Sequence, residues 1–233
     1  MSGHSKWATT KRQKAVVDAK RGAVFTKIGN QIAIAARAGT DPTMNPSLAM
    51  VLEKARAANM PKANIERAIA RVSDKNAAAL SEETYEAYGP GGVAIIIEAA
   101  TDNKNRTMPE VRHTLDKNGG RMAEPGSVMF QFTRKGVIFT KQKGDEVMMS
   151  ALEAGAEDVI DEEDGTTIYT AASDLAKVRE AIIASGIEID SAELQYVPNN
   201  TVELDDEKAE KVEKLLNAVD DLDDVTAVHT NAA

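Results

Sequence analysis

The stretch Gly89-Pro90-Gly91-Gly92-Val93-Ala94-Ile95-Ile96-Ile97-Glu98-Ala99-Ala100 carries the clearest fold signal in this chain of 233 residues. A glycine-rich turn followed by a nearly continuous apolar run is typical of a buried central strand. The glycines precede the strand and lack a Gly-Lys-Ser/Thr ending, so they do not match a phosphate-binding loop. The stretch therefore predicts a sheet with a covered strand at residues 93–100.

The residues after this strand alternate between helical and strand patterns. Thr107, with Glu110 three positions later, forms a capping-box pattern that opens a helix through about Lys117. Residues 128–132 and 137–140 are predicted as two strands around a turn at Arg134-Lys135-Gly136. The remaining pattern predicts a helix at 145–154, strands at 157–161 and 166–170, a helix capped by Ser173, a strand at 187–197, a helix at 206–219 and a strand at 225–229.

This element order predicts an α+β protein with more than one domain. Residues 76–143 plus 200–233 would form a β-α-β-β-α-β ferredoxin-like domain, into which residues 144–199 insert as a second, acidic α+β domain. Two consecutive α+β domains are the alternative arrangement.

The first 75 residues predict a separate helical domain. Phe25, Ile28, Ile32 and Ala35 recur at helical spacing and mark the apolar face of a first helix. Asn45-Pro46 supplies a capping side chain and a first-turn proline for a second helix, and a third begins near Pro61. Three short helices with few aromatic residues make a small bundle.

Charge is distributed very unevenly along the chain. The net charge is −9, yet residues 1–75 carry 14 Lys and Arg against 5 Asp and Glu. Residues 76–143 are nearly neutral, with 9 against 8, and residues 144–233 carry 5 against 24. A basic first third is what a surface that binds a polyanion needs.

The basic residues of this first third are the candidate nucleic-acid contacts. Cations at this density, with Ser and Thr between them and one Trp, suit phosphate contacts plus one stacking contact. A solvated basic surface is the alternative, and Trp7 is equally suited to anchoring the N-terminal segment in a small core. The candidates are Lys6, Trp7, Lys11, Arg12, Lys14, Lys20, Arg21, Lys27, Arg67 and Arg71.

A second candidate cluster lies where the buried strand ends and a helix begins. It runs from Asp102 to Thr107, and its cations Lys104 and Arg106, with Arg112 further along, are candidate ligands of an anion at the helix N-terminus. A cap-and-turn role without a ligand is the alternative.

Several function classes lack support in the composition. Cysteine is absent, and the three histidines, His4, His113 and His229, show no metal-ligand spacing, so we expect neither a metal nor another cofactor. No pair of carboxylates suggests acid–base catalysis. The longest apolar run, residues 93–97, is far shorter than a membrane span, and the N-terminal residues contain no apolar signal segment. We expect a cytoplasmic monomer without a small-molecule substrate.

The chain resembles the YebC/PmpR family over nearly its whole length. The motifs that carry the resemblance are Gly3-His4-Ser5-Lys6-Trp7, Asp18-Ala19-Lys20-Arg21, Phe25-Thr26-Lys27, Asn59-Met60-Pro61 with Ile65 and Arg67-Ala68-Ile69, Tyr88-Gly89-Pro90-Gly91-Gly92, Thr101-Asp102-Asn103, Asn105-Arg106-Thr107, Glu110-Val111-Arg112-His113 and Gly126-Ser127-Val128.

The resemblance implies a helical N-terminal domain and two α/β domains, the third inserted in the second. It also implies a non-enzymatic regulator of gene expression that binds DNA through the N-terminal domain. Mitochondrial relatives act as translational activators, and bacterial members are linked to ribosomes stalled on proline-rich stretches, so a translation factor that binds ribosomal RNA is the alternative. The family motifs place functional cations at Lys6, Lys11, Lys20, Arg21, Lys27, Arg106 and Arg112. Lys104 stands where arginine is more usual, which keeps the charge but loses the bidentate fork.

Two rival classes remain beside nucleic-acid binding. One is an enzyme; the other is an adaptor that holds a basic protein through the acidic C-terminal part. Charge reversal at Lys20 and Arg21 separates the binder from the adaptor, because only a nucleic-acid binder loses affinity and salt dependence.

Overall fold

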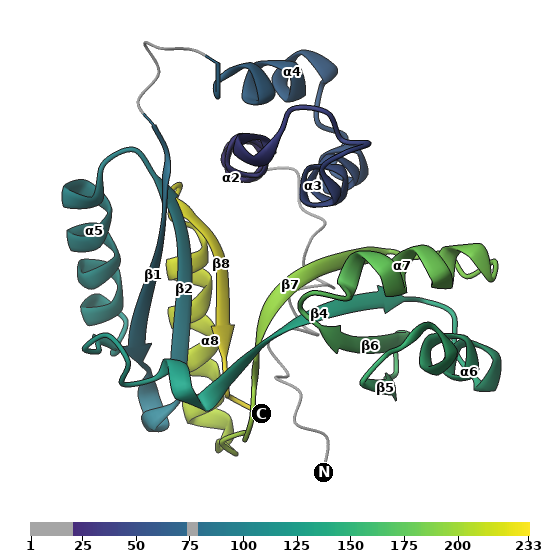
Figure 1. Cartoon of the computed structure of the whole chain (residues 1–233). Coiled ribbons are helices and arrows are strands. Elements are labelled where there is room, and N and C mark those ends of the chain that lie inside the picture. Colours follow the sequence, from purple (N-terminus) through teal and green to yellow (C-terminus); the bar gives the residue numbers. More distant parts are fainter. Residues whose placement is uncertain (1–20, 74–78) are drawn as a thin grey trace. The chain divides into compact units, whose positions relative to one another are not determined.

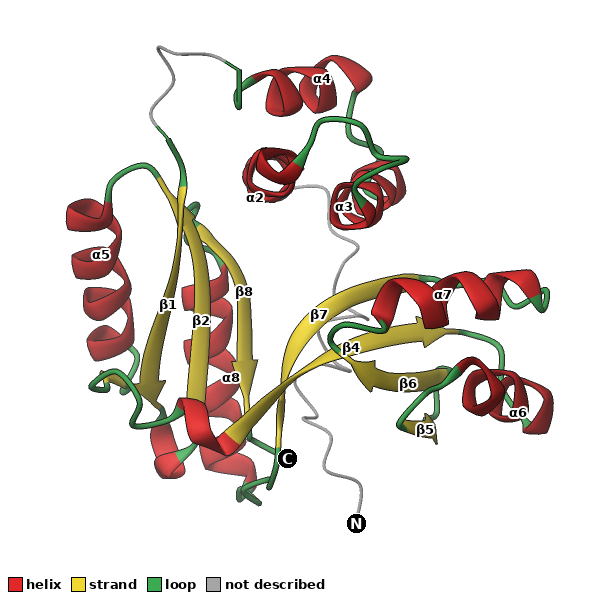
Figure 2. Ribbon diagram, in the orientation of Figure 1, coloured by secondary structure: helices red, strands yellow, loops and turns green. Residues whose placement is uncertain are grey.

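The computed structural model describes residues 21–73 and 79–233 and confirms a mixed α+β fold (Figures 1 and 2). The chain divides into two compact units. Unit 1 contains the residues up to Phe132 together with Pro198–Ala233, and unit 2 contains Thr133–Val197. Unit 2 is therefore inserted in the sequence of unit 1.

The N-terminal part of unit 1 is helical, as predicted. Its elements are α2 (Arg21–Ala35), the 3-10 turn η2 (Ala36–Ala38), α3 (Pro46–Ala57) and α4 (Lys62–Ala70). The Asn45 side chain accepts a hydrogen bond from the Leu48 amide at 3.1 Å and caps α3, and Pro46 occupies its first turn. Ile28, Ile32 and Leu52 form the small core between the helices. The sequence pattern predicts the first helix from about residue 16 to residue 38, and residues 16–20 of it lie outside the described residues.

The rest of unit 1 is a four-stranded sheet covered by two helices. The strands are β1 (Ser81–Tyr88), β2 (Ala94–Thr101), β3 (Arg121–Met122) and β8 (Val225–Thr230), in the order β3-β1-β2-β8. The helices are α5 (Lys104–Lys117) and α8 (Asp206–Asp220). β2 is the covered central strand that the sequence predicts: Ile95 and Ile97 are fully buried against Leu115 and Leu215.

The sequence prediction missed β1. This strand contains Glu82, Glu83 and Glu86, and glutamate is uncommon in strands. Glu86 is nevertheless buried, and its carboxylate accepts hydrogen bonds from the amides of Gly126 at 2.5 Å, Val128 at 2.5 Å and Met129 at 2.9 Å. Burial alone would raise the pKa of Glu86, but these three donors hold it below its ordinary value.

Two helix caps differ from the prediction. α5 begins at Lys104, and its cap is Asn103, whose side chain accepts from the Arg106 amide at 3.2 Å. Thr107 instead lies inside the helix, where its hydroxyl is fully buried against Thr101 and Asp224. At the start of α7 (Leu175–Ala184) the capping position is Asp174 and not Ser173.

The predicted hairpin around Gly136 is wrong. Residues 129–131 form a 3-10 turn, η4 (Met129–Gln131), and one continuous strand, β4 (Phe132–Thr140), follows. Gly136 is not a turn residue: a Cβ there would lie 2.8 Å from the Leu175 Cβ, so glycine is needed for α7 to pack on the strand.

Unit 2 is built on this strand and has the β-α-β-β-α-β order that the sequence analysis assigned to the other sheet. Its further elements are α6 (Asp145–Ala154), β5 (Asp158–Asp161), β6 (Thr166–Ala171) and β7 (Ser191–Pro198), with strand order β5-β6-β4-β7. Because β4 pairs with β6, unit 2 begins at Thr133 and not near residue 144. The sequence analysis divided this region into two strands around a turn and assigned both to the sheet of unit 1.

We predict that Glu86→Gln lowers the free energy of unfolding at neutral pH by about 1–3 kcal/mol, because the amide turns a donor toward a backbone N–H. The folded-state pKa lies below the unfolded value of about 4.3. The stabilisation by the wild-type carboxylate is therefore complete above that value and is lost as pH falls through the folded pKa, so the difference between the two proteins shrinks.

Chemical denaturation followed by circular dichroism over a pH series measures this difference. Glu82→Gln on the same strand is the matched control, because Glu82 is exposed. Equal stability of all three proteins at neutral pH would contradict the assignment.

Candidate nucleic-acid interface

The structure describes the side chains of some of the cations predicted from the sequence and not those of the others. Arg21 opens α2, and its side chain is not described. The described side chains are those of Lys27, Arg67, Arg71, Lys104, Arg106 and Arg112. The candidates outside the described residues are Lys6, Trp7, Lys11, Arg12, Lys14 and Lys20.

The outer surface of the helical part carries exposed cations. Arg56 on α3 and Arg67 on α4 are exposed and have no ion pair within residues 21–73 and 79–233. Lys62 is 88% exposed and lies 3.6 Å from Glu66, a geometry that contributes little on a solvated surface. These side chains are available to a phosphate backbone without the loss of a buried contact.

Lys27 has a different environment. Its side chain is only 14% exposed, and its ammonium group donates to the backbone oxygen of Asp220 and lies 3.8 Å from the Asp220 carboxylate. One turn further along α2, the Gln31 side chain donates to the Thr226 backbone oxygen at 3.4 Å. Lys27 is thus engaged in a contact inside unit 1 between α2 and the end of α8.

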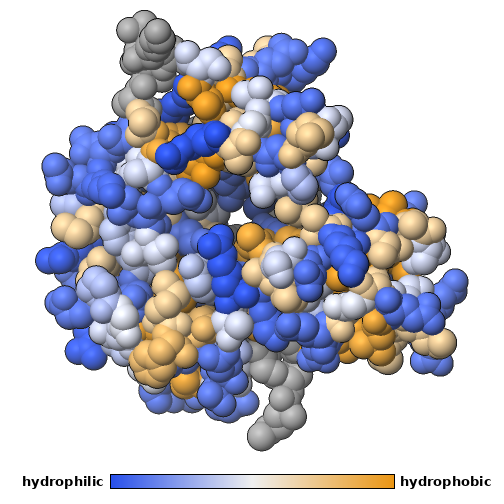
Figure 3. All heavy atoms as spheres, viewed as in Figure 1, coloured by the Kyte–Doolittle hydropathy of each residue, from blue (hydrophilic) through white to orange (hydrophobic). Residues whose placement is uncertain are grey.

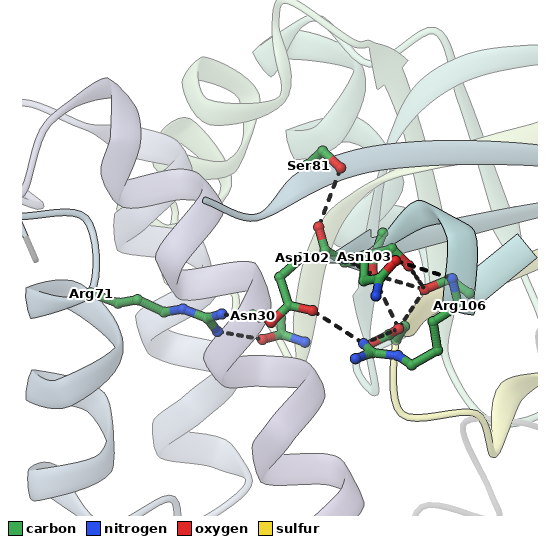
Figure 4. Close-up of polar contacts among 9 residues, drawn as sticks. Asn30, Arg71, Ser81, Asp102, Asn103 and Arg106 are labelled. Atoms are coloured by element: carbon green, nitrogen blue, oxygen red, sulfur yellow. Dashed lines mark hydrogen bonds and ion pairs between the residues drawn. The ribbon is translucent and has the colours of Figure 1, made fainter. Parts of the chain in front are cut away.

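Arg71 is likewise engaged inside unit 1. Its guanidinium lies 3.6 Å from the Asp102 carboxylate and donates to the Asn30 side chain at 3.4 Å (Figure 4). Asp102 also lies 3.3 Å from Arg106. This carboxylate therefore connects the end of α4 with the first turn of α5.

Arg106 lies between two carboxylates. Besides Asp102, it donates to Asp224 at 2.7 Å, and the hydroxyls of Thr107 and Thr101 donate to the same Asp224 oxygen at 2.5 and 3.2 Å. Partial burial would raise the pKa of Asp224, but these hydrogen bonds, that of Arg106 first, hold it below its ordinary value. The hydrogen bond to Asp224 also raises the pKa of Arg106.

The start of α5 therefore carries its own anions. Lys104 lies 2.6 Å from Glu83, although 61% of its side chain is exposed. Arg112 is exposed and has no ion pair in the described part of the chain, and Figure 3 shows largely hydrophilic residues along α5. The contacts favour the cap-and-turn role for Asp102–Thr107, and they leave Arg112, with Lys104, as the accessible cations.

Sequence reasoning missed the carboxylates that occupy these arginines. Asp224 lies more than a hundred residues from Arg106 and belongs to an acidic run, 220–224, that reads as a solvated loop. Nothing in the local pattern marks which of its four aspartates turns inward. Only the pairing of β8 with β2 brings Asp224 to α5.

The described residues hold no group of three or more His, Cys, Asp or Glu side chains arranged for a metal ion. None of their helices has the length and apolar character of a membrane span.

Comparison with protein families accounts for nearly the whole chain. Residues 5–75 match the TACO1/YebC protein N-terminal domain, and residues 80–232 match the TACO1/YebC second and third domain. The boundary between the two matches falls where the helical part ends and β1 begins.

Curated relatives cover the chain at about half identity. A "probable transcriptional regulatory protein" of Moorella thermoacetica is 52% identical over 240 residues, covering 100% of this chain and 95% of its own length. A protein of the same description from Bifidobacterium animalis subsp. lactis is 50% identical, covering 99% and 94%. The crystal structure of a conserved hypothetical protein from Aquifex aeolicus superimposes with a TM-score of 0.91 at 42% identity, covering 98% of this chain and 97% of that one. The names are those of regulators and not of enzymes.

We predict that Asp224→Asn lowers the free energy of unfolding by about 1–3 kcal/mol, because one anionic oxygen accepts three hydrogen bonds there. Thermal and chemical unfolding measure the change. Asp223→Asn removes the same charge from the exposed neighbouring position and is expected to have no such effect. If both variants were equally stable, Asp224 would not hold α5 against β8.

Proposed function

Because this chain belongs to the TACO1/YebC family, we propose that it is a non-enzymatic regulator of gene expression that binds nucleic acid through its basic helical part. Curated relatives bear the name of transcriptional regulators, which supports a role in transcription and duplex DNA as the partner. We place the protein in the cytoplasm, as a monomer, and assign it no cofactor.

The separation of charge carries this proposal. The described helical residues 21–73 hold 8 Lys and Arg against 3 Asp and Glu, and Arg56 and Arg67 are exposed without an ion pair in that part of the structure. Unit 2 holds 6 Lys and Arg against 14 Asp and Glu. A polyanion is attracted to the first surface and repelled by the second.

The structure narrows the set of proposed contacts. We retain Arg67 and Arg112, which are exposed without an ion pair in the described residues, and Lys104, which is 61% exposed and has only Glu83 as a partner there. We also retain Lys6, Trp7, Lys11, Arg12, Lys14, Lys20 and Arg21 from the sequence motifs. Lys27, Arg71 and Arg106 hold internal carboxylates, so a phosphate would have to compete with Asp220, Asp102 and Asp224. We assign Lys27 and Arg71 to positioning the helical part on the sheet, and Arg106 to holding α5 against the start of β8.

A ribosomal RNA partner is the second candidate, and the lack of a helix-turn-helix pattern in the sequence of residues 21–73 favours it. In the structure, α3 and α4 each pack mainly on α2. Phosphate contacts without a recognition helix read shape and not sequence, which suits structured RNA. In this arrangement the protein would act in translation.

Charge reversal tests nucleic-acid binding directly. We predict that Arg67→Glu weakens binding to a fluorescent duplex DNA and reduces the slope of log K against log salt by about 1, the value of one lost phosphate contact. The Lys20→Glu/Arg21→Glu double variant should lose about twice as much slope. Fluorescence anisotropy over a salt series measures both.

The control for these variants is Lys177→Glu, which reverses an exposed charge in unit 2. It should leave the salt slope unchanged. A loss of affinity on Lys177→Glu, with Arg67→Glu unaffected, would refute binding through the helical part.

Sedimentation separates the two partners. If ribosomal RNA is the target, the tagged protein sediments with ribosomes through a sucrose cushion, and this recovery disappears with salt, with ribonuclease and with Lys20→Glu/Arg21→Glu. Retention on duplex DNA without ribosome sedimentation at any salt supports the transcriptional role instead.

A further inference from the structure

One phenylalanine in the described part of unit 1 has its ring exposed to solvent. Phe130 in η4 is 72% exposed, whereas Phe132 and Phe139 are 7% and 6% exposed. Across residues 21–73 and 79–233 it is the only exposed side chain among Phe, Tyr and Trp.

The backbone that carries this ring is fixed from its N-terminal side. The Glu86 carboxylate binds the amides of Val128 and Met129 as well as that of Gly126, and the Val128 side chain is fully buried. A buried carboxylate with three backbone donors is a strong and specific anchor. The exposure of Phe130 is therefore imposed by a rigid turn.

The C-terminal side of the turn is held as firmly. The Asn199 amide donates to the Gln131 backbone oxygen at 2.8 Å, and the Asn199 side chain donates to the Phe130 backbone oxygen at 3.3 Å. The Gln131 side chain accepts from Asn231 at 3.2 Å. Every backbone segment next to Phe130 is thus bonded to unit 1, while the ring itself is left outside.

An arginine stacked on a tyrosine ring is hydrogen-bonded to the same loop. The Arg121 guanidinium stacks over the Tyr88 ring, 5.3 Å from its centroid, and the Tyr88 hydroxyl donates to the Ser127 backbone oxygen at 2.9 Å. Arg121 is exposed on the short edge strand β3. The loop that leads to Phe130 therefore joins an exposed ring to an exposed cation that is already oriented by stacking.

We propose that Phe130, with the Arg121–Tyr88 stack, is a binding site for unpaired bases of a single-stranded nucleic acid. A base would stack on the Phe130 ring, and the guanidinium of Arg121 would contact a phosphate or a second base. This inference rests on the proposed function, because it adds a base-binding site to the phosphate-binding surface. RNA and DNA share the chemistry, and the test distinguishes them.

The area of the patch favours this occupant over a protein. An exposed phenylalanine offers at most about 200 Å², whereas a stable protein interface buries about 800 Å² on each partner. Phe130 stands between the partly buried Met129 and the polar Gln131 in the sequence, and the polar Asn199 is hydrogen-bonded to its backbone oxygen. A single ring with a neighbouring cation is sufficient for base stacking and insufficient for a dimer interface.

Binding of single strands to the full chain tests the site. Oligonucleotides of one sequence, as single-stranded RNA, single-stranded DNA and duplex DNA, carry 2-aminopurine as the reporter of stacking. Phe130→Ala should raise the Kd for the single strands about tenfold and abolish the 2-aminopurine quench, with the duplex Kd unchanged. Phe130→Trp should restore both, and Arg121→Ala should weaken single-strand binding in the same direction. The increase in Kd for single-stranded RNA, compared with that for single-stranded DNA, shows which of the two the site binds more tightly.

Met149→Ala is the matched control, because it removes an apolar side chain that is 61% exposed in unit 2. If Phe130→Ala binds single strands as tightly as the wild type, and the wild type binds duplex DNA, the base-binding site is refuted. The proposed function is then still supported. A wild type that binds none of the three nucleic acids overturns both. A change of oligomeric state on Phe130→Ala, seen by light scattering, assigns the ring to a second copy and also overturns the proposal.

Discussion

Two carboxylates, Asp102 and Asp224, hold unit 1 together. Asp102 follows the last residue of β2 and contacts Arg71 after α4 and Arg106 on α5, while Asp224, just before β8, contacts Arg106 and two threonine hydroxyls. The helical part, α5, the central strand β2 and the edge strand β8 therefore meet at one polar network. Each charge in it has a partner of opposite charge, which offsets the desolvation cost of partial burial. Removal of one partner would leave an unpaired charge and destabilise the unit.

This network also decides which cations face outward. Lys27, Arg71 and Arg106 are basic residues by sequence, yet they neutralise carboxylates of the same unit. What remains exposed is a smaller set on α3, α4 and α5, and it is this set that gives the helical part its surface charge. The acidic unit 2 has no comparable excess of cations, so attraction to phosphate is confined to one part of the chain.

Much of the fold follows from local pattern, and the exceptions have physical causes. The Asn45-Pro46 cap, the buried β2 and α6 with its exact bounds are readable because capping chemistry and apolar periodicity are local. β1 is not, because its buried glutamate, Glu86, is satisfied by a loop forty residues away, and Gly136 resembles a turn residue although it makes room for Leu175. Only part of the candidate site could be predicted, for the same reason. The basic residues are evident from the sequence, but the carboxylates that form ion pairs with them come from elements distant in the sequence.

The account predicts that one surface meets the nucleic acid while unit 2 stays outside. Amide hydrogen exchange of the intact chain, with and without duplex DNA and with and without ribosomes, tests this most directly. Protection on binding should be concentrated in residues 1–73 and along α5, with residues 133–197 unchanged. Protection confined to residues 133–197 would contradict it and would favour an adaptor that holds a basic partner through its acidic unit.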